Sequence, residues 1–226
     1  MGIQDRRERE KSERRQHILR CTKELLMEHG VDSVGMADIA KKAELSKGTL
    51  YLYFSKKEDL FKEICDEAAE RFLKHFYAAM PPDMSGLDAL KFCWRCYLDM
   101  FGESEDMILI FNMKYYIASE FPFNPFDADQ EPDSTYIFYT LIRDMIRQGV
   151  TEGVFDPEVK EKVIARTLLS LFSYIVENVA KLPKRERKPY LLIEEIRQTF
   201  EIILRGIARE GVERSLLRLP GLSDSR

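Results

Sequence analysis

The feature that most constrains this chain lies between residues 15 and 55, where two short helical segments follow a longer one. The longer segment, 15–29, places Ile18, Leu25 and Leu26 on one face at helical spacing, and Gly30 is suited to end it. The short segments are expected at about 37–43 and from Ser46, whose hydroxyl can cap the first turn. Two short helices joined by a tight turn and held by a third predict a helix-turn-helix, whose second helix enters the DNA major groove.

The composition favours helices in the rest of the chain as well. Of 226 residues, 45% are hydrophobic and 33% are charged. A chain of this length with this hydrophobic fraction can bury a stable core without cross-links. Only 11 Gly and 9 Pro are present, too few for the many turns of an all-β fold. The charged residues are rich in Glu, Lys and Arg, which are good helix formers. We therefore expect an all-α fold of about nine helices.

The sequence offers no signal for export or membrane insertion. No apolar run approaches the ~18 residues needed to cross a bilayer. The first residues are polar and charged, without the apolar stretch of a secretory signal. We expect a cytoplasmic protein with no membrane partner, in which the four cysteines stay reduced.

The charge is divided unevenly along the chain. Residues 1–62 carry 14 Lys and Arg against 11 Asp and Glu, whereas residues 63–226 carry 21 against 28. The net charge of −4 argues against general coating of nucleic acid, but it leaves room for one local DNA-binding face.

The remaining helices follow from capping signals and apolar stripes. Ser55 and Glu58 have the spacing of a capping box that opens a long helix ending before Pro81. Five further helices are expected beyond it, at 85–101, 104–119, 134–148, 157–182 and 189–210. We predict two domains: a helix-turn-helix domain at 1–62 and a larger helical domain at 63–226.

The first 14 residues are almost entirely polar and form either a mobile arm or a frayed extension of the first helix. Arginines alternate with acidic residues there, as on a solvated helix face whose charges pair with one another. The alternative is a basic arm that reaches into the DNA minor groove.

The stretch from Asp38 to Leu60 closely resembles the tetracycline-repressor-like (TetR) family of bacterial transcription regulators. The family pattern is roughly Ile-Ala-x-x-Ala-Gly-Val-Ser-x-Gly-Thr-Leu-Tyr-x-Tyr-Phe, followed by Ser-Lys-Glu-x-Leu. The matching positions here include Ile39, Ala40, Ala43, Ser46, Gly48, Thr49, Leu50, Tyr51, Tyr53 and Phe54. The resemblance covers about residues 14–62.

The resemblance implies a set of residues that contact DNA. Ser46 would cap the recognition helix, Lys47 and Thr49 would face the groove, and Gly48 would let the backbone approach closely. Tyr51 would contact a base or a phosphate, Tyr53 would contact a phosphate, and Lys57, at the start of the fourth helix, would contact another phosphate. The full set is Ser46, Lys47, Gly48, Thr49, Tyr51, Tyr53 and Lys57, and Phe54 is expected in the core.

Two positions depart from the family pattern. Glu44 stands where the turn usually has Gly, so it must adopt a left-handed conformation or shift the turn. Gly35 stands where the second helix usually opens with Ser or Thr, and it brings no hydroxyl for a phosphate. Both departures bear on the strength of DNA binding, and the fold is expected to remain.

For residues beyond 62, the resemblance implies a ligand-binding and dimerisation domain. The segment 148–156 is similar to the turn that the family carries between its seventh and eighth helices. The last two helices of two chains would form a four-helix bundle. Its seam could come from Val163, Thr167, Leu171, Tyr174 and Val179 with Ile196, Phe200, Ile203 and Ile207, unless these stripes face only their own core. A neighbouring strip on the eighth helix, Ile164, Leu168, Phe172 and Ile175, leaves apolar residues for both tasks.

Aromatic residues between 72 and 139 are the candidates for a ligand pocket. We predict a small apolar or aromatic effector bound by Trp94, Tyr97, Phe101, Phe111, Tyr115, Phe138 and Tyr139. The alternative for each is an ordinary place in the core.

Other chemistry finds little support in the sequence. Cys93 and Cys96 form a Cys-x-x-Cys pair that is expected to be structural, with a thiol redox sensor or a metal site as alternatives. No catalytic serine motif, phosphate-binding glycine loop or His–carboxylate cluster occurs, so we expect neither an enzyme nor a cofactor.

These features lead to one functional hypothesis and one alternative. The first is a homodimeric, ligand-responsive repressor that binds a palindromic operator in double-stranded DNA. The alternative is a protein-interaction module that uses its acidic helical domain, with a vestigial DNA-binding fold.

Overall fold

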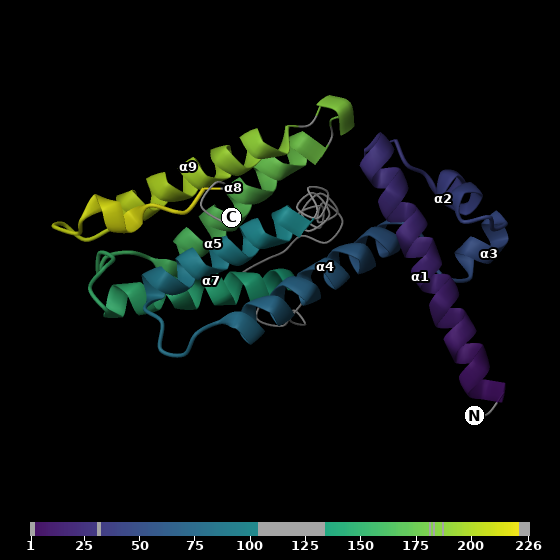
Figure 1. The fold of residues 1–226 in the computed structure, drawn as a ribbon, viewed down its shortest axis with the longest axis horizontal. Coiled ribbons are helices and arrows are strands. Elements are labelled where there is room, and N and C mark those ends of the chain that lie inside the picture. The colour runs from purple at the N-terminus through teal and green to yellow at the C-terminus, as the bar shows by residue number, and fades with distance from the viewer. Residues whose placement is uncertain are drawn as a thin grey trace.

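The computed structural model describes residues 3–30, 33–103, 134–180, 182, 184–186 and 188–221. Within these ranges the chain forms eight α-helices, and the expected all-α fold is confirmed. The molecule is elongated, with the first three helices at one end and a bundle of the later helices at the other (Figure 1). The helix expected at 104–119 lies outside the described residues.

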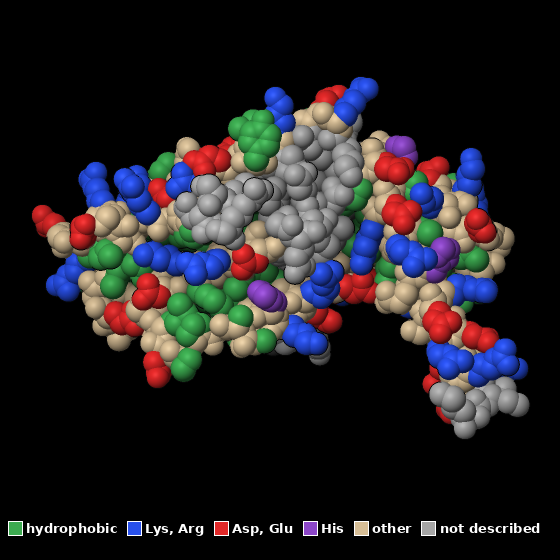
Figure 2. Space-filling model, in the orientation of Figure 1, with side chains coloured by type: hydrophobic (Ala, Val, Ile, Leu, Met, Phe, Trp, Pro, Cys, Tyr) green, Lys and Arg blue, Asp and Glu red, His purple; other side chains and the backbone are tan. Residues whose placement is uncertain are grey.

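The N-terminal end consists of α1 (Ile3–His29), α2 (Met36–Lys42) and α3 (Lys47–Tyr51). The α1 helix is continuous from Ile3, so the polar N-terminal residues extend the helix instead of forming an irregular arm. Its projecting end carries acidic and basic side chains side by side (Figure 2). Arg6 Nε lies 2.8 Å from Glu10 and Arg9 Nε lies 3.7 Å from Glu13, so these charges are paired along the helix surface.

The second part of the molecule contains α5 (Gly86–Glu103), α7 (Ser134–Thr151), α8 (Glu161–Ala180) and α9 (Pro189–Ile207). The long α4 helix (Lys57–Ala79) runs from the N-terminal end into this bundle (Figure 1). No helix among the described residues has the length and apolarity needed to cross a membrane.

Two apolar cores meet along α4. The first core joins α1, α2 and α3 to the first part of α4, which contributes Leu60, Phe61 and Ile64. The second core begins at Ala69 and takes Phe72 and Phe76 from the same helix. Since α4 contributes to both cores, a tilt of this helix in one core displaces its end in the other.

Glycines allow the start of α5 to pack closely on the end of α7. A Cβ atom on Gly86 would lie 2.3 Å from the backbone N of Gly149, and one on Gly149 would lie 2.5 Å from the ring of Phe155. Neither position can carry a side chain without moving backbone or a fully buried ring. The segment 148–156 therefore forms a tight turn against α5, and Gly153 within it has a φ of 76°.

The residues after α9 fold back over the bundle. The backbone N–H groups of Asp156 and Arg209 donate to the carbonyls of Ile207 and Val154, each at 2.9 Å. A 3-10 turn (Arg214–Leu217) follows and places Leu217 in the core, as Leu219 is further along. The sequence predicts helix for the first residues of this tail (residues 208–221), to about residue 210, and it does not predict how the rest of the tail packs.

Several expected helix ends are wrong. The α9 helix ends at Ile207 and not at 210, because the chain pairs there with the segment before α8. The α8 helix begins at Glu161 and not at Pro157, because the Asp156 carboxylate accepts the N–H of Glu158 at 2.8 Å and caps only a turn. Ser85, by contrast, caps α5 as expected, since its Oγ accepts the N–H of Asp88 at 3.1 Å.

Candidate DNA-binding site

The turn between α2 and α3 is built around Glu44, which adopts the left-handed conformation with a φ of 55°. The N–H of Leu45 donates to the carbonyl of Ala40 at 2.9 Å, and that of Glu44 donates to Lys41 at 3.2 Å. This pair of bonds is the Schellman pattern that ends a helix, usually with Gly at the left-handed position. The first expectation for Glu44, that it tolerates this backbone, is therefore met, and the turn does not shift.

Ser46 caps α3 as expected. Its side-chain oxygen accepts the N–H of Thr49 at 3.1 Å, and the two hydroxyl oxygens lie 2.8 Å apart. Ser46, Lys47 and Gly48 are exposed, and Thr49 is half-exposed. At Gly48 the nearest atom to an added Cβ is 3.8 Å away, so the outer surface of the first turn is open. The α3 helix thus presents a narrow, polar first turn to solvent.

The end of α3 presents two tyrosines differently. Tyr51 is 51% exposed, whereas Tyr53 is half-buried and packs beside the first core. Between them Leu52 is the most exposed large apolar residue described, at 81%. Phe54 is buried among the first three helices and α4, which confirms the expectation for that residue. The alternation of exposed and buried side chains fixes which face of the segment meets solvent.

The start of α4 differs from the sequence-based expectation. The predicted capping box is wrong, because the helix begins at Lys57, after Lys56 as its N-cap without a side-chain bond. Ser55 instead donates its hydroxyl to the carboxylate of Asp59. Lys57 is half-buried, and its Nζ lies 5.4 Å from the ring centroid of Phe61. Its ammonium group is therefore partly held against the protein before any DNA contact.

Gly35 caps the start of α2 with an extended backbone at a φ of −113°. Its N–H donates to the Asp38 carboxylate at 3.0 Å, which closes the first turn without a hydroxyl. The departure noted in the sequence is therefore accommodated in the fold, and what is lost is one polar group on the exposed surface.

Sequence patterns place Arg15 at the start of the helix expected at 15–29, beside the alternating charges of the N-terminal segment, and indicate no contact with the segment after α3. Its guanidinium reaches across to the segment after α3, where Nη1 donates to the Tyr53 carbonyl at 2.9 Å. The available signal was its spacing from Ile18 and Leu19, which places Arg15 one turn before them on the inward side of α1.

The candidate ligand residues that the structure describes lie in the second core. Trp94, Tyr97, Phe138 and Tyr139 are all buried. Trp94 stacks on Tyr97 with ring centroids 5.5 Å apart, and its indole N–H donates to the carbonyl of Pro220 at 2.8 Å. The side chain of Phe101 and all of Phe111 and Tyr115 lie outside the described residues.

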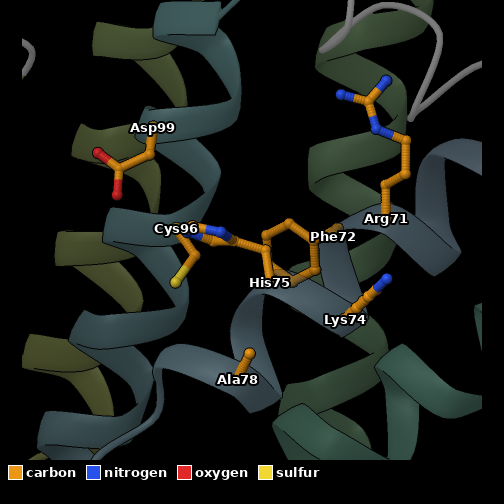
Figure 3. A pocket seen from close by; sticks show the side chains of 7 residues that line it. All are labelled: Arg71, Phe72, Lys74, His75, Ala78, Cys96 and Asp99. Carbon is orange, nitrogen blue, oxygen red and sulfur yellow. The ribbon is translucent and has the colours of Figure 1, made fainter.

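A cavity of about 370 Å³ opens between α4 and α5, close to these aromatics. Its walls combine apolar surface from Phe72, Ala78 and Cys96 with charged or polar groups (Figure 3). The polar lining consists of Arg71, Lys74, His75 and Asp99. Of the predicted ligand residues that are described, none lines this cavity. It could hold a small molecule with an apolar body and a polar end.

Cys93 and Cys96 lie on α5 and are not joined to each other. Burial raises the pKa of the Cys93 thiol to about 12 and that of Cys96 to about 11. Thiols with raised pKa values are poor nucleophiles and poor metal ligands. No cluster of His, Cys, Asp or Glu suited to a metal ion occurs among the residues that the structure describes.

The candidate dimer seam divides between the two helices. On α8, Val163, Leu171 and Tyr174 are exposed, while the neighbouring strip of Ile164, Leu168, Phe172 and Ile175 belongs to the core as expected. On α9 the expected residues face inward, since Ile196 and Ile207 are buried and Phe200 and Ile203 pack against the core. The apolar residues that α9 exposes are Tyr190, Leu191 and Ile202. On α9 the burial therefore favours the alternative, in which this stripe faces only the core of its own chain.

Comparison of sequences connects the chain to known regulators. Residues 18–64 match the model of a family described as bacterial regulatory proteins, tetR family. A helix-turn-helix-type transcriptional regulator of Staphylococcus aureus strain MRSA252 is 24% identical over 163 residues, which cover 68% of this chain and 86% of the relative. A regulator of strain USA300 is 25% identical over 164 residues with the same coverage.

Comparison of structures extends the likeness over most of the chain. The fatty acid degradation regulator FadR from Bacillus halodurans has a TM-score of 0.60 at 18% identity, covering 84% of this chain and 94% of that one. FadR from Thermus thermophilus, solved with lauroyl-CoA, has a TM-score of 0.55 at 18% identity, covering 88% and 98%. A gamma-butyrolactone receptor has a TM-score of 0.58 at 15% identity, covering 92% and 95%. At these identities the similarity is one of fold.

Proposed function

We infer that this chain belongs to the TetR family of bacterial DNA-binding transcription regulators. We propose that it is a homodimeric repressor that releases its palindromic operator when a small ligand binds. The repressor would act in the cytoplasm. The observation that carries the proposal is the exposed first turn of α3, with the Ser46 cap, Lys47 and the open space at Gly48.

The DNA contacts are proposed to follow from that exposure. Lys47 and Thr49 would reach base edges, because residues at the N-terminal end of a recognition helix enter the groove first. Tyr51 would contact a base or a phosphate, and Tyr53 would contact a phosphate. Lys57 would contact a further phosphate once its ammonium leaves the Phe61 ring. The carboxylate of Glu44 lies exposed in the adjoining turn and would lower the affinity for phosphate.

The dimer is proposed to form through α8 and α9. Tyr174 on α8 and Ile202 on α9 are 64% and 67% exposed, and burying such apolar side chains against a second copy would remove them from water. Leu171 and Val163 on α8 extend the same apolar surface. A second copy of the chain would cover these residues and bring two recognition helices to one DNA face.

The effector is proposed to be a small molecule with an apolar or aromatic body and an acidic group. The α4–α5 cavity supports this choice, because Arg71, Lys74 and His75 stand beside the apolar walls of Phe72 and Cys96. The T. thermophilus FadR neighbour binds lauroyl-CoA, which combines an acyl chain with anionic groups. A ligand at this place would push on α4, which also contributes to the first core, and so favour a state with a different spacing of the recognition helices.

The proposal is tested by selecting bound duplexes from a random DNA pool at two salt concentrations. We expect enrichment of one palindromic sequence and an affinity that falls steeply with salt, since several phosphate contacts release counterions. Enrichment of a sequence without twofold symmetry would contradict the dimeric arrangement. Binding without enrichment of any sequence would contradict the reading of bases by α3.

A further inference from the structure

The guanidinium of Arg15 joins three parts of the molecule. Its Nε donates to Glu63 Oε1 at 2.7 Å, and its Nη2 donates to the second oxygen of the same carboxylate. Its Nη1 donates to the carbonyl of Tyr53 at 2.9 Å. The plane of the group lies over the Phe54 ring, with Cζ 4.1 Å from the ring centroid.

These contacts bridge the short connection between α3 and α4. Tyr53 and Phe54 directly follow the recognition helix, and Glu63 lies two turns inside α4. A planar fork with five N–H donors can satisfy a carboxylate and a carbonyl at once, whereas the single ammonium of a lysine cannot do so in the same geometry. One side chain of α1 therefore links the segment after α3 to the body of α4.

A second polar contact on the same two helices lacks this link. Glu67, one turn further along α4, accepts from Gln16 and Lys23, each at 2.9 Å. The Lys23–Glu67 pair is as exposed as the Arg15–Glu63 pair, but it does not reach the segment after α3. The Lys23–Glu67 pair can therefore serve as a control, because it shows what an ion pair between α1 and α4 contributes to DNA binding without a contact to the segment after α3.

We propose that Arg15 and Glu63 are positioning residues for DNA reading, which hold Tyr53 and the recognition helix in a fixed orientation to α4. This inference rests on the proposed function and deepens it. When α4 moves, the contacts of Arg15 with Glu63 and with the Tyr53 carbonyl (the Arg15 joint) would move the end of α3 with it. Without the joint, the apolar core still holds the helices together, but the end of α3 is free to shift against α4.

The sharpest test replaces acidic residues, because electrostatics and positioning then predict opposite results. Glu63→Gln removes a negative charge near DNA, which by charge alone would tighten binding. If Glu63 positions α3 through Arg15, the variant instead binds the selected operator about tenfold more weakly, because a charged hydrogen-bonded pair is lost. The matched control Glu67→Gln is expected to bind as tightly as the wild type or slightly more tightly.

Arg15→Lys is the third variant, since it keeps the positive charge but loses the planar guanidinium that contacts Glu63 and Tyr53 at once. We expect an affinity loss similar to that of Glu63→Gln, and both variants should remain folded at the temperature of the assay. Operator binding by Glu63→Gln that equals or exceeds that of the wild type would overturn the inference. Equal losses in Glu63→Gln and Glu67→Gln would also overturn it, because they would indicate general loosening of α1 from α4.

Amide hydrogen exchange gives a readout that does not depend on DNA. The N–H groups of Tyr53 and Phe54 donate to the carbonyl of Leu50 at 3.0 and 3.1 Å, so they report on the end of α3. Their exchange should be faster in Arg15→Lys and in Glu63→Gln, and unchanged in Glu67→Gln. If the wild type selects no operator, the proposed function fails, while this measurement still decides whether the joint exists. Unchanged exchange in Arg15→Lys would refute it.

Discussion

At the scale of single residues, the turn before the recognition helix carries a strained position. Glu44 has a φ of 55°, a conformation that costs a residue with a Cβ roughly 1–2 kcal/mol. The hydrogen bonds of Leu45 and Glu44 to α2 maintain it. The strain lies next to the proposed DNA-binding face, where the same residue also places a negative charge.

Glu44→Gly is therefore expected to stabilise the protein by about 1 kcal/mol, because relief of strain exceeds the entropy cost of glycine. It should also tighten operator binding by removing the charge. Thermal unfolding followed by circular dichroism measures the first effect. Glu44→Gln is the control, since it should tighten binding without raising the melting temperature. A lower melting temperature for Glu44→Gly would contradict this account of the turn.

Thr49 and Tyr53 are expected to affect DNA binding in different ways. Thr49→Ala should change the sequence selected from a random pool, because Thr49 lies in the turn that would meet base edges. Tyr53→Phe should weaken binding to all sites alike, because a phosphate contact carries no sequence information. Thr49→Ser is the control, since it keeps the hydroxyl that lies 2.8 Å from Ser46 Oγ. An unchanged sequence preference in Thr49→Ala would show that this residue does not read bases.

The thiols of α5 are expected to be unreactive. Because burial raises the pKa values of Cys93 and Cys96 to about 12 and 11, both remain protonated at pH 8, where a free cysteine is partly ionised. Iodoacetamide should label them at pH 8 only after unfolding in urea, as measured by mass spectrometry of the peptide 91–98. Rapid labelling of either residue in the folded protein would support a redox role instead.

At the scale of elements, the tail after α9 is the part that determines how the second core is closed. Glu201 is buried and accepts the N–H of Leu219 at 3.0 Å, and Arg205 lies 2.9 Å from its other oxygen. Pro220 accepts the indole N–H of Trp94. One polar side chain and one aromatic side chain thus tie residues 208–221 to the bundle.

Leu217→Ala is expected to lower the free energy of unfolding by about 2–5 kcal/mol, because Leu217 is 1% exposed and its loss leaves a cavity. Trp94 is the single tryptophan and lies under the tail, so its fluorescence in a urea titration reports the change. The control Leu216→Ala, at the neighbouring exposed position, should change the free energy by less than about 0.5 kcal/mol. Equal effects of both variants would show that the tail is not part of the core.

Sequence reasoning identified the helices well and some of their ends poorly. Ser46 and Ser85 were recognised because a cap is a local interaction between a side chain and the next turn. Ser55 and Asp156 carry equally good local signals, but Ser55 bonds to the Asp59 carboxylate and Asp156 caps only a turn, so the helices begin later, at Lys57 and Glu161. The tail was missed because its apolar residues show no helical or strand period, and only the surface left by α5 and α9 gives them a place.

In the candidate site, the local features were predictable from the sequence and the long-range contacts were not. The exposure of the α3 face follows from a motif confined to a few consecutive turns. The role of Arg15 depends on a residue 48 positions away along the chain, a pairing that periodicity cannot reveal. Which face of α9 is turned toward the core depends on which of its two apolar sides packs on Trp94 and the tail.

At the scale of the whole molecule, the exposed apolar residues of α8 and α9 predict the assembly. Ile202→Glu should convert the proposed dimer into a folded monomer and abolish operator binding, because an unpaired charge would be buried at the proposed interface. Sedimentation velocity measures the change in mass. Tyr77→Glu is the control, since Tyr77 is similarly exposed but lies on α4. A dimer that persists in Ile202→Glu would show that the interface does not include Ile202.

Hydroxyl-radical footprinting of the wild-type protein on its selected operator tests most directly whether two copies of α3 read one duplex. We expect two protected segments related by twofold symmetry, with centres about one helical turn (~34 Å) or a multiple of it apart. A single protected segment, or two segments without symmetry, would contradict the binding of two copies.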